Sequence, residues 1–300
     1  MREIPKLFMM VGIPGSGKSQ EAELIAEEHN AVIHASDKLR EEFNHQVSNA
    51  VLFDELHKRI HRDLIVGKNV VYDATNINSK RRISFLRSLK NIPCEKIAIL
   101  MMTPYEQCLN NNTEREESVP ESVIKRMYKN FQVPYYCEGF DVIQVVLWQD
   151  ENYKEPWEVV EDYKDFDQEN THHSLTLDQH LKRAFDYAEV RFIKNESGYV
   201  PEVVWASLLH DIGKPFCKEF KEDDKNAHYY NHMNVGAYDS FFYTSSLNCD
   251  SLLIAWLINW HMEPFLWKKD EKLKEKRLKL WGKDLFEMIE KLHEADLFAH

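Results

Sequence analysis

The 300-residue sequence predicts an α/β domain with a parallel, doubly wound sheet, followed by an all-α domain. Two observations support this prediction. Up to about residue 150, short apolar runs alternate with segments of helical periodicity, which is typical of a parallel sheet covered by helices. From about residue 167 onward the pattern is helical, without convincing period-2 strands, and most of the 14 histidines lie there.

A glycine-rich loop separates the first expected strand, residues 7–11, from the first expected helix, residues 20–29. Its sequence, GIPGSGKS, has the G-x-x-x-x-G-K-S spacing of a Walker A loop, whose backbone N–H groups cradle phosphate oxygens beside a helix N-terminus. Lys18 is expected to reach the β- and γ-phosphates, and Ser19 to ligate Mg²⁺. The sequence therefore predicts a site for ATP or another nucleoside triphosphate, which includes Gly12, Gly15, Ser16, Gly17, Lys18 and Ser19.

The composition limits the classes of function. The net charge of −12 argues against coating a long nucleic acid, although a local patch could hold a strand end or a short oligonucleotide. The five cysteines form no C-x-x-C pair, which favours reduced thiols and no zinc ribbon. No apolar run reaches the length of a membrane span. We therefore expect a cytoplasmic protein without a membrane partner.

An acidic residue follows the second expected strand, residues 31–34, at Asp37, and Arg40 comes three positions later. The carboxyl edge of a parallel sheet is where doubly wound folds bind their ligands. Asp37 could accept a proton from an attacking hydroxyl, and Arg40 could hold an acceptor phosphate. From the residues alone, Asp37 could equally be a helix cap.

The third expected strand begins at Val70 and ends in Asp73. An aspartate at this position commonly holds the Mg²⁺ shell in phosphate-loop enzymes. A basic helix begins at Ser79, and we expect its three cations to form a solvated face: Lys80, Arg81 and Arg82.

The fourth and fifth expected strands cover residues 97–102 and 140–147. Between them lie a polar, flexible stretch, residues 110–120, and a helix that starts at Pro120. This region resembles a basic lid, with Arg115 and Arg126 neutralising charge in the transition state. The alternative is an ordinary amphipathic surface helix.

Four segments in this order, GIPGSGKS, SDKLR, VVYDATN-x-NSKRR and VPESVIKRMYKNF, resemble the phage-type polynucleotide 5′-kinase family over nearly all of residues 5–148. The resemblance implies that Asp37 is the general base on a 5′-hydroxyl and that Arg40 orients the acceptor phosphate. It implies ATP and Mg²⁺ as cofactors. Lys125 and Arg126 compete for one lid position, and Asp73 falls where the family varies.

The segment 149–170 is rich in acidic residues and contains Pro156, which indicates a tether with parts that pack on a domain. We therefore expect a first domain at 1–150 with a lid around 110–131, a linker at 151–166, and a second domain at 167–300.

The second domain centres on the adjacent pair His210-Asp211, which ends an apolar helix and is followed by Gly213 and Lys214. Further imidazole and carboxylate groups lie on or beside separate expected helices: His173, His180, His232, His261 and Asp296. Such ligands suit Mn²⁺, Co²⁺, Ni²⁺, Fe²⁺ or Zn²⁺, and so many of them suit two metals that share a carboxylate. For His228, His293 and His300 we expect packed or surface side chains.

The order HSLTLDQH, LLHDIGKP, NHMNVGA, NWHM and HEADLFAH resembles the HD phosphohydrolase superfamily over about residues 170–300, and most of all the HD domains of CCA-adding tRNA nucleotidyltransferases. The resemblance implies one metal on His180, His210, Asp211 and Asp296. It implies a second metal on His232 and His261 that shares Asp211. Lys214 would contact a substrate phosphate, and the role of His173 stays open.

A basic run covers residues 266–283. Such runs are usually solvated helix faces, but beside a phosphoesterase site this one is also the best candidate for holding a polynucleotide.

Together the two domains predict a bifunctional enzyme that heals RNA or DNA strand ends, with cleaved tRNA among the candidate substrates. The kinase half would phosphorylate a 5′-hydroxyl, and the HD half would remove a 2′,3′-cyclic, 2′- or 3′-phosphate. Such an enzyme would work with a nucleic-acid ligase, and it could form a homo-oligomer. The alternatives are a small-molecule kinase fused to a nucleotide phosphohydrolase, and a kinase with a non-catalytic regulatory HD module.

Overall fold

The computed structural model describes residues 4–115, 117–150, 153–169, 175–193, 201–222 and 224–300. The chain divides into two compact units. Unit 1 contains residues 1–127 and 134–148, and unit 2 contains residues 128–133 and 149–300. This division differs from the expected boundaries, since the short segment 128–133 groups with the second unit.

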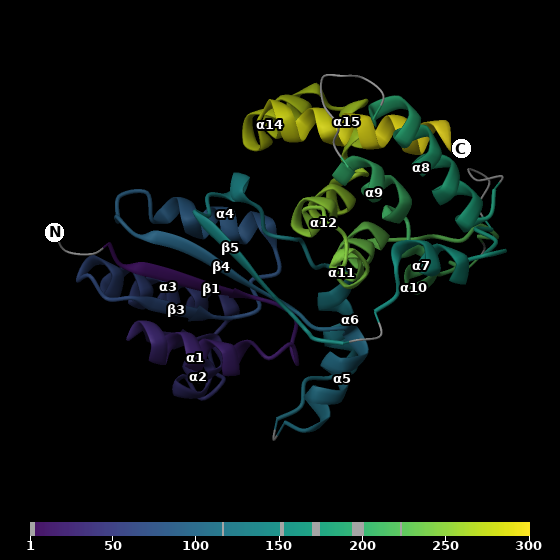
Figure 1. The fold of residues 1–300 in the computed structure, drawn as a ribbon. Coiled ribbons are helices and arrows are strands. Elements are labelled where there is room, and N and C mark those ends of the chain that lie inside the picture. Colours follow the sequence, from purple (N-terminus) through teal and green to yellow (C-terminus); the bar gives the residue numbers. More distant parts are fainter. Residues whose placement is uncertain (1–3, 116, 151–152, 170–174, 194–200, 223) are drawn as a thin grey trace. The chain divides into compact units, whose positions relative to one another are not determined.

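Unit 1 is built on a five-stranded parallel sheet with the strand order β2-β3-β1-β4-β5 (Figure 1). The strands are β1 (Lys6–Val11), β2 (Val32–Ala35), β3 (Val70–Asp73), β4 (Glu95–Met102) and β5 (Val142–Leu147). Neighbouring strands pair in register, with Leu7 opposite Val70 and Lys96. The carboxyl ends of β1, β2 and β3 therefore meet at one edge, and the expected α/β class is confirmed.

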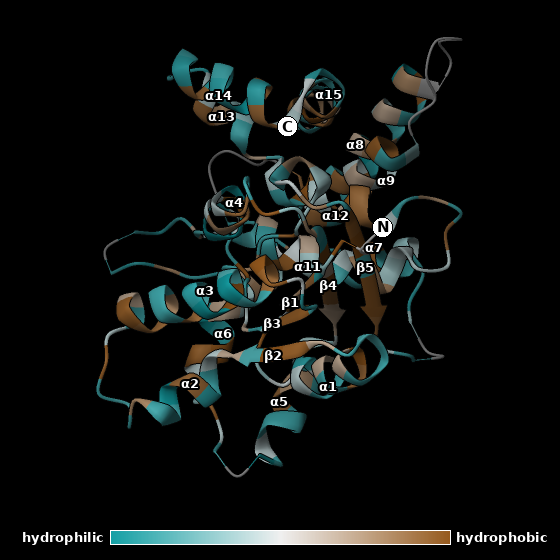
Figure 2. Cartoon of the chain, turned by 90° about the vertical axis from the view of Figure 1, so that its left-hand side faces the viewer, coloured by the Kyte–Doolittle hydropathy of each residue, from teal (hydrophilic) through white to brown (hydrophobic). Residues whose placement is uncertain are grey.

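Helices connect these strands because parallel neighbours require crossovers. They are α1 (Lys18–His29), α2 (Ser36–Glu42), α3 (Asn49–Ile65), α4 (Ser79–Ser88), α5 (Tyr105–Thr113) and α6 (Glu121–Lys129), and a 3₁₀ turn, η1, covers Tyr136–Glu138. The central strands β1 and β3 are almost completely buried and apolar, and Figure 2 shows the strands of this sheet in the brown of hydrophobic residues. On one sheet face, Phe8, Met10 and Ile99 pack against Ala22 and Ile25 of α1.

Two expectations for unit 1 are wrong. Residues 110–113, expected to be part of a flexible stretch, belong to α5, where Asn111 donates to the Gly15 carbonyl and Asn112 bonds both polar groups of the Val119 backbone. These tertiary bonds outweigh the low helix propensity of asparagine. Arg82, expected on a solvated face, is 1% exposed and forms a two-bond salt bridge with the buried Glu138, at 2.6 and 2.7 Å.

Unit 2 is helical, apart from one isolated antiparallel bridge between Glu219 and His228 in its described part. Its helices are α7 (Pro156–Asp162), α8 (Leu177–Ile193), α9 (Pro201–Leu209), α10 (Lys214–Cys217), α11 (His232–Thr244), α12 (Ser251–Trp260), α13 (Glu263–Trp267), α14 (Glu271–Trp281) and α15 (Lys283–Phe298). The apolar helices α9 and α12 pack on each other and on α8, α11 and α15. Among the described residues, no helix is long and apolar enough to cross a membrane.

Two local features position the helices of unit 2. Gly213 lies so close to α11 that a Cβ there would meet the His232 carbonyl oxygen at 2.2 Å, so the absence of a side chain lets the start of α10 approach the start of α11. The segment 128–133 packs into the same unit. Val133 donates to the Asn259 side chain at 2.9 Å, and the Phe131 ring meets Tyr238 edge-on.

Candidate functional sites

The glycine-rich loop connects β1 to α1 and carries two left-handed glycines, Gly15 (φ 82°) and Gly17 (φ 87°). A Cβ on Gly15 would lie 2.1 Å from the Cys108 carbonyl oxygen, and one on Gly12 would lie 2.5 Å from the Ser16 hydroxyl. The loop geometry therefore requires glycine at position 15, as a backbone that closes around phosphate oxygens does, and a side chain at position 12 would displace the Ser16 hydroxyl.

The loop fits a triphosphate with Mg²⁺ in its charge as well as in its shape. The Lys18 side chain is buried and donates to the Ile13 carbonyl at 2.8 Å, and burial lowers the pKa of its ammonium group. The buried Ser16 hydroxyl has no hydrogen-bond partner among the described residues. An anion would compensate the buried ammonium and give this hydroxyl a partner. Ser19 donates to Asp73 at 3.0 Å, so the two expected Mg²⁺ side chains lie together.

A cleft of about 330 Å³ adjoins the loop in unit 1 and contains further expected residues. Lys18, Ser19, Asp37, Asp73 and Arg115 all line it, and an Arg115 nitrogen lies 3.9 Å from an Asp37 oxygen. Burial raises the pKa of Asp73, against the opposing effect of Lys18. A carboxylate, an ammonium and a guanidinium thus face one space, which is an arrangement that can position and neutralise a transferring phosphoryl group.

Two other expected residues lie elsewhere. The Arg40 guanidinium donates to the Asn49 side chain at 3.0 Å and does not line this cleft. Arg126 is exposed on α6 and is not among the described residues around the loop or the cleft. Of the two lid arginines, the structure brings Arg115 to the phosphate loop.

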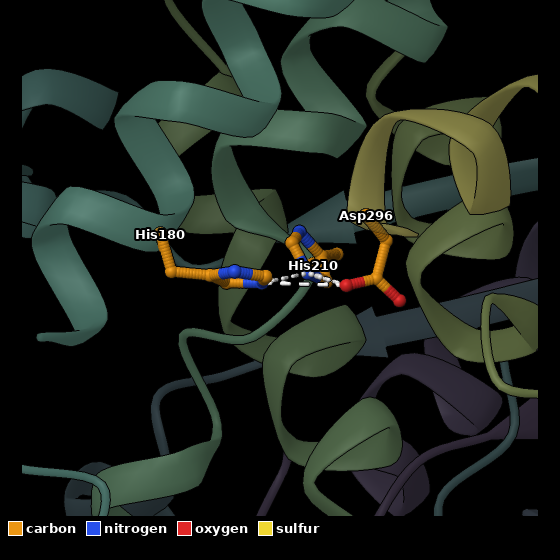
Figure 3. Close-up of side chains that lie close together, drawn as sticks. All are labelled: His180, His210 and Asp296. Carbon is orange, nitrogen blue, oxygen red and sulfur yellow. Dashed lines mark hydrogen bonds and ion pairs between the residues drawn. The ribbon is translucent and has the colours of Figure 1, made fainter. Parts of the chain in front are cut away.

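In unit 2, His180 of α8, His210 after α9 and Asp296 of α15 converge in the buried interior (Figure 3). The Nε2 atoms of the two histidines are 3.0 Å apart, and they lie 3.3 and 3.4 Å from one Asp296 oxygen. The figure shows both rings directed toward the carboxylate, so donor atoms from three separate segments lie close together around one position.

A second group contains Asp211, His232 and His261, which are also buried. His232 Nε2 and His261 Nε2 lie 3.0 and 3.6 Å from Asp211 Oδ1. The other oxygen, Asp211 Oδ2, lies 3.4 Å from the Nε2 atoms of both His180 and His210. Asp211 therefore joins the two groups through its two oxygens.

The protonation of the four imidazoles can be read from their outer nitrogens. Each Nδ1 faces a backbone carbonyl, those of Ala299, Ser207, Tyr229 and Ile258, at 3.4, 2.9, 2.8 and 2.7 Å respectively. A carbonyl only accepts, so each Nδ1 carries a proton, and Nε2 is the nitrogen that a neutral ring would present to a metal ion. Two lone pairs that face each other at 3.0 Å repel unless a positive charge lies between them. This donor set fits divalent metal ions.

The pKa shifts of His210 and Asp211 also indicate that positive charge is favoured at this site. Burial disfavours a charged His210, yet the carboxylates of Asp211 and Asp296 outweigh it and raise the pKa of His210 to about 10. Burial likewise opposes ionisation of Asp211, but Lys214 and His210 hold the pKa of that carboxyl well below its usual range. Divalent metal ions held by these residues would supply this charge, and they would provide a hydroxide nucleophile and a clamp for a phosphoester.

A cavity of about 550 Å³ opens onto these ligands. Asp211, His232, His261 and Asp296 line it on one side, together with Lys214, and the other wall is apolar and aromatic: Tyr229, Tyr230, Met262, Phe265 and Leu297. Lys214 is buried and bonds Asp211 at 2.6 Å and the Gln168 side chain at 2.7 Å. The cavity can therefore accept a phosphoester that carries a hydrophobic or aromatic group.

Sequence reasoning missed two residues here. His300, expected to be a packed or surface side chain, lines the cavity with its Nε2 3.4 Å from Asp296. Gln168, in the expected tether region, holds Lys214. The i, i+4 spacing of Asp296 and His300 on one helical turn was a usable signal, whereas nothing in the sequence pointed to Gln168. His173 lies outside the described residues.

Comparisons with known proteins agree with the division of the chain into two units. Residues 7–134 match the family model described as AAA domain, and residues 173–296 match the one described as HD domain. The first part of the chain thus resembles an AAA domain and the second part an HD domain. The expected helical class of the second part is thereby confirmed.

Two curated relatives that match part of the chain are kinases. An L-seryl-tRNA(Sec) kinase of Methanococcus maripaludis is 26% identical over 148 residues, which are 47% of this chain and 58% of the relative. An adenylate kinase of a Sulfurovum species is 32% identical over 97 residues, 31% of this chain and 43% of the relative. The chain thus spans about half the length of these relatives.

Among solved structures, the Pnkp1/Rnl/Hen1 RNA repair complex aligns with 42% of this chain and 44% of the matched chain, at 23% identity and a TM-score of 0.37.

Proposed function

We propose that the chain is a bifunctional nucleic-acid end-healing enzyme, which phosphorylates a 5′-hydroxyl end and removes a 2′,3′-cyclic, 2′- or 3′-phosphate. The observation that carries this proposal is that one chain holds a phosphate loop facing Asp37 and a separate buried His/Asp cluster beside a cavity. A kinase site and a phosphohydrolase site act in opposite directions on phosphate. They serve one purpose when the substrate is a strand cut into a 5′-hydroxyl and a phosphorylated 3′ end.

In the kinase half, Asp37 would accept the proton of the 5′-hydroxyl. The hydroxyl oxygen would attack the γ-phosphorus of ATP, and ADP would leave. Lys18 and Arg115 would neutralise the charge that develops on the transferring group, and Ser19 with Asp73 would hold Mg²⁺. Arg40 would hold an acceptor phosphate. Trp148 is partly exposed and lines another cleft of unit 1 together with Gly15 and Gly17 of the loop, and its ring would contact the base of the nucleotide.

In the HD half, His180, His210, Asp211 and Asp296 would hold one metal, and His232 and His261 would hold a second that shares Asp211. The aromatic wall would carry the base or ribose of the terminal nucleotide. Lys214 would donate to a substrate phosphate oxygen while its bond to Asp211 orients that bridge.

The basic run also supports a polynucleotide substrate in part. Lys268, Lys269, Lys272 and Lys276 are exposed, and the Lys268 ammonium lies 5.7 Å from the ring of the cavity residue Phe265. Arg277 has a structural role instead, because it makes a two-bond salt bridge with Glu263 and lies over the Trp260 ring. The exposed lysines are therefore the part of the run that would contact a strand.

The deciding experiment uses an RNA that bears a 5′-hydroxyl and a 2′,3′-cyclic phosphate. We expect the chain, with ATP, Mg²⁺ and Mn²⁺, to label the 5′ end with the γ-phosphate and to open and remove the cyclic phosphate. Both ends are read on the same product, and a nucleic-acid ligase is then supplied to test whether the healed ends join. An unchanged 5′ end together with an unchanged 3′ end contradicts the proposal.

The similarity to an adenylate kinase favours a second candidate, in which the acceptor is a nucleoside or nucleotide. Offering 5′-hydroxyl oligonucleotides and free nucleosides as competing acceptors separates the two. Preferential labelling of the nucleosides would establish the small-molecule kinase instead.

A further inference from the structure

Unit 1 contains a second cavity, of about 450 Å³, which the phosphate-loop chemistry does not use. It lies over β3 between α3 and α4, and its lining comes from residues 49–57 and 72–88 with Met9. Thr75 lines both this cavity and the cleft that contains Lys18 and Asp37. A molecule that reaches from one space to the other would therefore pass Thr75.

Four aromatic rings form the inner wall of this cavity: Phe53, His57, Tyr72 and Phe85. His57 and Phe85 have ring centroids 4.4 Å apart, and Tyr72 meets Phe85 edge-on at 5.1 Å. His57 Nε2 and the Tyr72 hydroxyl lie 3.1 Å apart, so the imidazole is held in one orientation. Tyr72 and Phe85 are buried, whereas Phe53 and His57 keep part of their surface exposed.

The imidazole wall is neutral under ordinary conditions, because burial lowers the pKa of His57 to about 4. A neutral aromatic wall favours a flat, uncharged ring over a phosphate or a metal ion. The volume lies within the range of small-molecule pockets.

The mouth of the cavity is polar and leads toward the acceptor side of the kinase site. Asn49, Asn78 and Ser84 line it, and Arg81 adds a cation. The Asn49 side-chain oxygen accepts from Arg40, which belongs to the same short helix as Asp37. One hydrogen bond thus links the cavity to the helix that carries the general base of the proposed function.

We propose that this cavity binds the heteroaromatic base of the acceptor's 5′-terminal nucleoside. The base would stack on Phe53 and His57, the ribose would pass Thr75, and the 5′-hydroxyl would reach Asp37. Arg81 at the mouth would contact the phosphate that follows this nucleoside. The proposal rests on the proposed kinase function, and it names the group that positions the acceptor.

The test compares two acceptors of equal length, one with adenosine and one with an abasic ribose at the 5′-hydroxyl end. For the wild-type protein we expect a higher acceptor KM with the abasic end, and Phe53→Ala should raise the KM of the adenosine end by about 5- to 100-fold, as the loss of one base–aromatic stack does. The KM for ATP should not change. With the abasic acceptor, Phe53→Ala should have no further effect, since the stacking partner is already absent.

A second variant tests the cavity independently, in case Phe53→Ala does not fold. Ser84 is exposed at the mouth, so Ser84→Trp should fill the cavity without disturbing the core, and it should raise the KM of the adenosine acceptor only. Val51→Ala, an exposed position of α3 that does not line the cavity, is the matched control and should behave as wild type.

The outcomes distinguish the proposal of a base-binding cavity from the proposal of a kinase function. Equal KM values for both acceptors in the wild-type protein, or equal losses on both acceptors in Phe53→Ala, would overturn the base-binding cavity while the kinase function stands. An ATP-binding protein that transfers phosphate to neither oligonucleotide would overturn both proposals.

Discussion

The phosphate-loop site and the HD site hold their ligands in opposite ways. The first is mainly a backbone structure, whose glycines fix the loop, while Asp37 and Arg115 have side chains that are 76% and 41% exposed. The second is a side-chain structure, in which all six His and Asp donors are less than 10% exposed and are each held by a neighbour. The comparison teaches that backbone geometry defines the phosphate cradle in unit 1, whereas its charged side chains stay accessible to a substrate. In unit 2, buried side chains define the site, and their packing fixes the positions of the donor atoms.

The largest expected effect comes from Asp211→Asn, which keeps the volume of the side chain but removes the charge that joins both ligand groups. We expect phosphohydrolase activity to fall to the background rate. Metal affinity should fall by more than the roughly 10–100-fold that a residue which merely orients a metal ligand is worth. Metal content of the purified protein and hydrolysis of an aryl phosphate measure this. The 5′-kinase activity should be unchanged, and its loss would mean that the sites are not independent.

Asp37→Asn should lower the kinase rate by about 10²–10⁴-fold, which is the usual contribution of a general base. ATP binding should persist, because the loop that holds the phosphates is made by the backbone. The acceptor is supplied at saturation so that the change is read in kcat. HD activity in the same preparation is the control, and a kinase rate within tenfold of wild type would remove Asp37 from the mechanism.

Gly15→Ala tests whether the backbone alone defines the first site. The left-handed conformation costs an alanine about 1–2 kcal/mol, and its Cβ would also collide with the Cys108 carbonyl. We expect ATP binding, measured by calorimetry, to be lost. Gly67→Ala is the matched control, because Gly67 has φ 84° but open space around its Cα. This variant should lose stability through the conformational cost alone and still bind ATP.

The last prediction concerns the dependence of stability on pH, and the sign of this dependence differs between the units. In unit 2, burial raises the pKa of Asp239, which accepts from Tyr128, to about 7. The unfolded carboxyl ionises first, so the stability of unit 2 falls as pH rises from about 4 to 7, by at most about 1.4 kcal/mol per pH unit. In unit 1, the lowered pKa of His57 makes stability fall as pH drops from about 6.5 to 4.

Thermal unfolding monitored across this range should show the two opposite slopes. Asp239→Asn keeps an acceptor for Tyr128 and should flatten only the slope of unit 2. A slope that is unaffected by this variant would exclude Asp239 as its source.

The sequence predicted those features whose residues lie close together in the chain. The phosphate loop, the strand-end aspartates and the His210-Asp211 pair carry their chemistry in short motifs, and the strands around them are apolar runs of clear length. Arg82 could not be placed, because its partner Glu138 is distant in sequence and a basic helical face usually meets solvent. The same holds for Gln168 with Lys214. The aromatic cavity was also not predictable, since its rings come from α3, β3 and α4 without any motif.

The segment 128–133 has a consequence for dissecting the protein. The chain leaves unit 1 after Met127, contributes Tyr128, Phe131 and Val133 to unit 2, and then returns to complete β5. No single cut therefore separates two intact halves. A fragment that ends at Trp148 would carry two buried aromatic side chains without their partners, and a fragment that begins at Gln149 would lack the backbone that satisfies Asn259. Point substitutions are therefore the way to test the two sites separately, because any truncation between them would disturb the packing of unit 2.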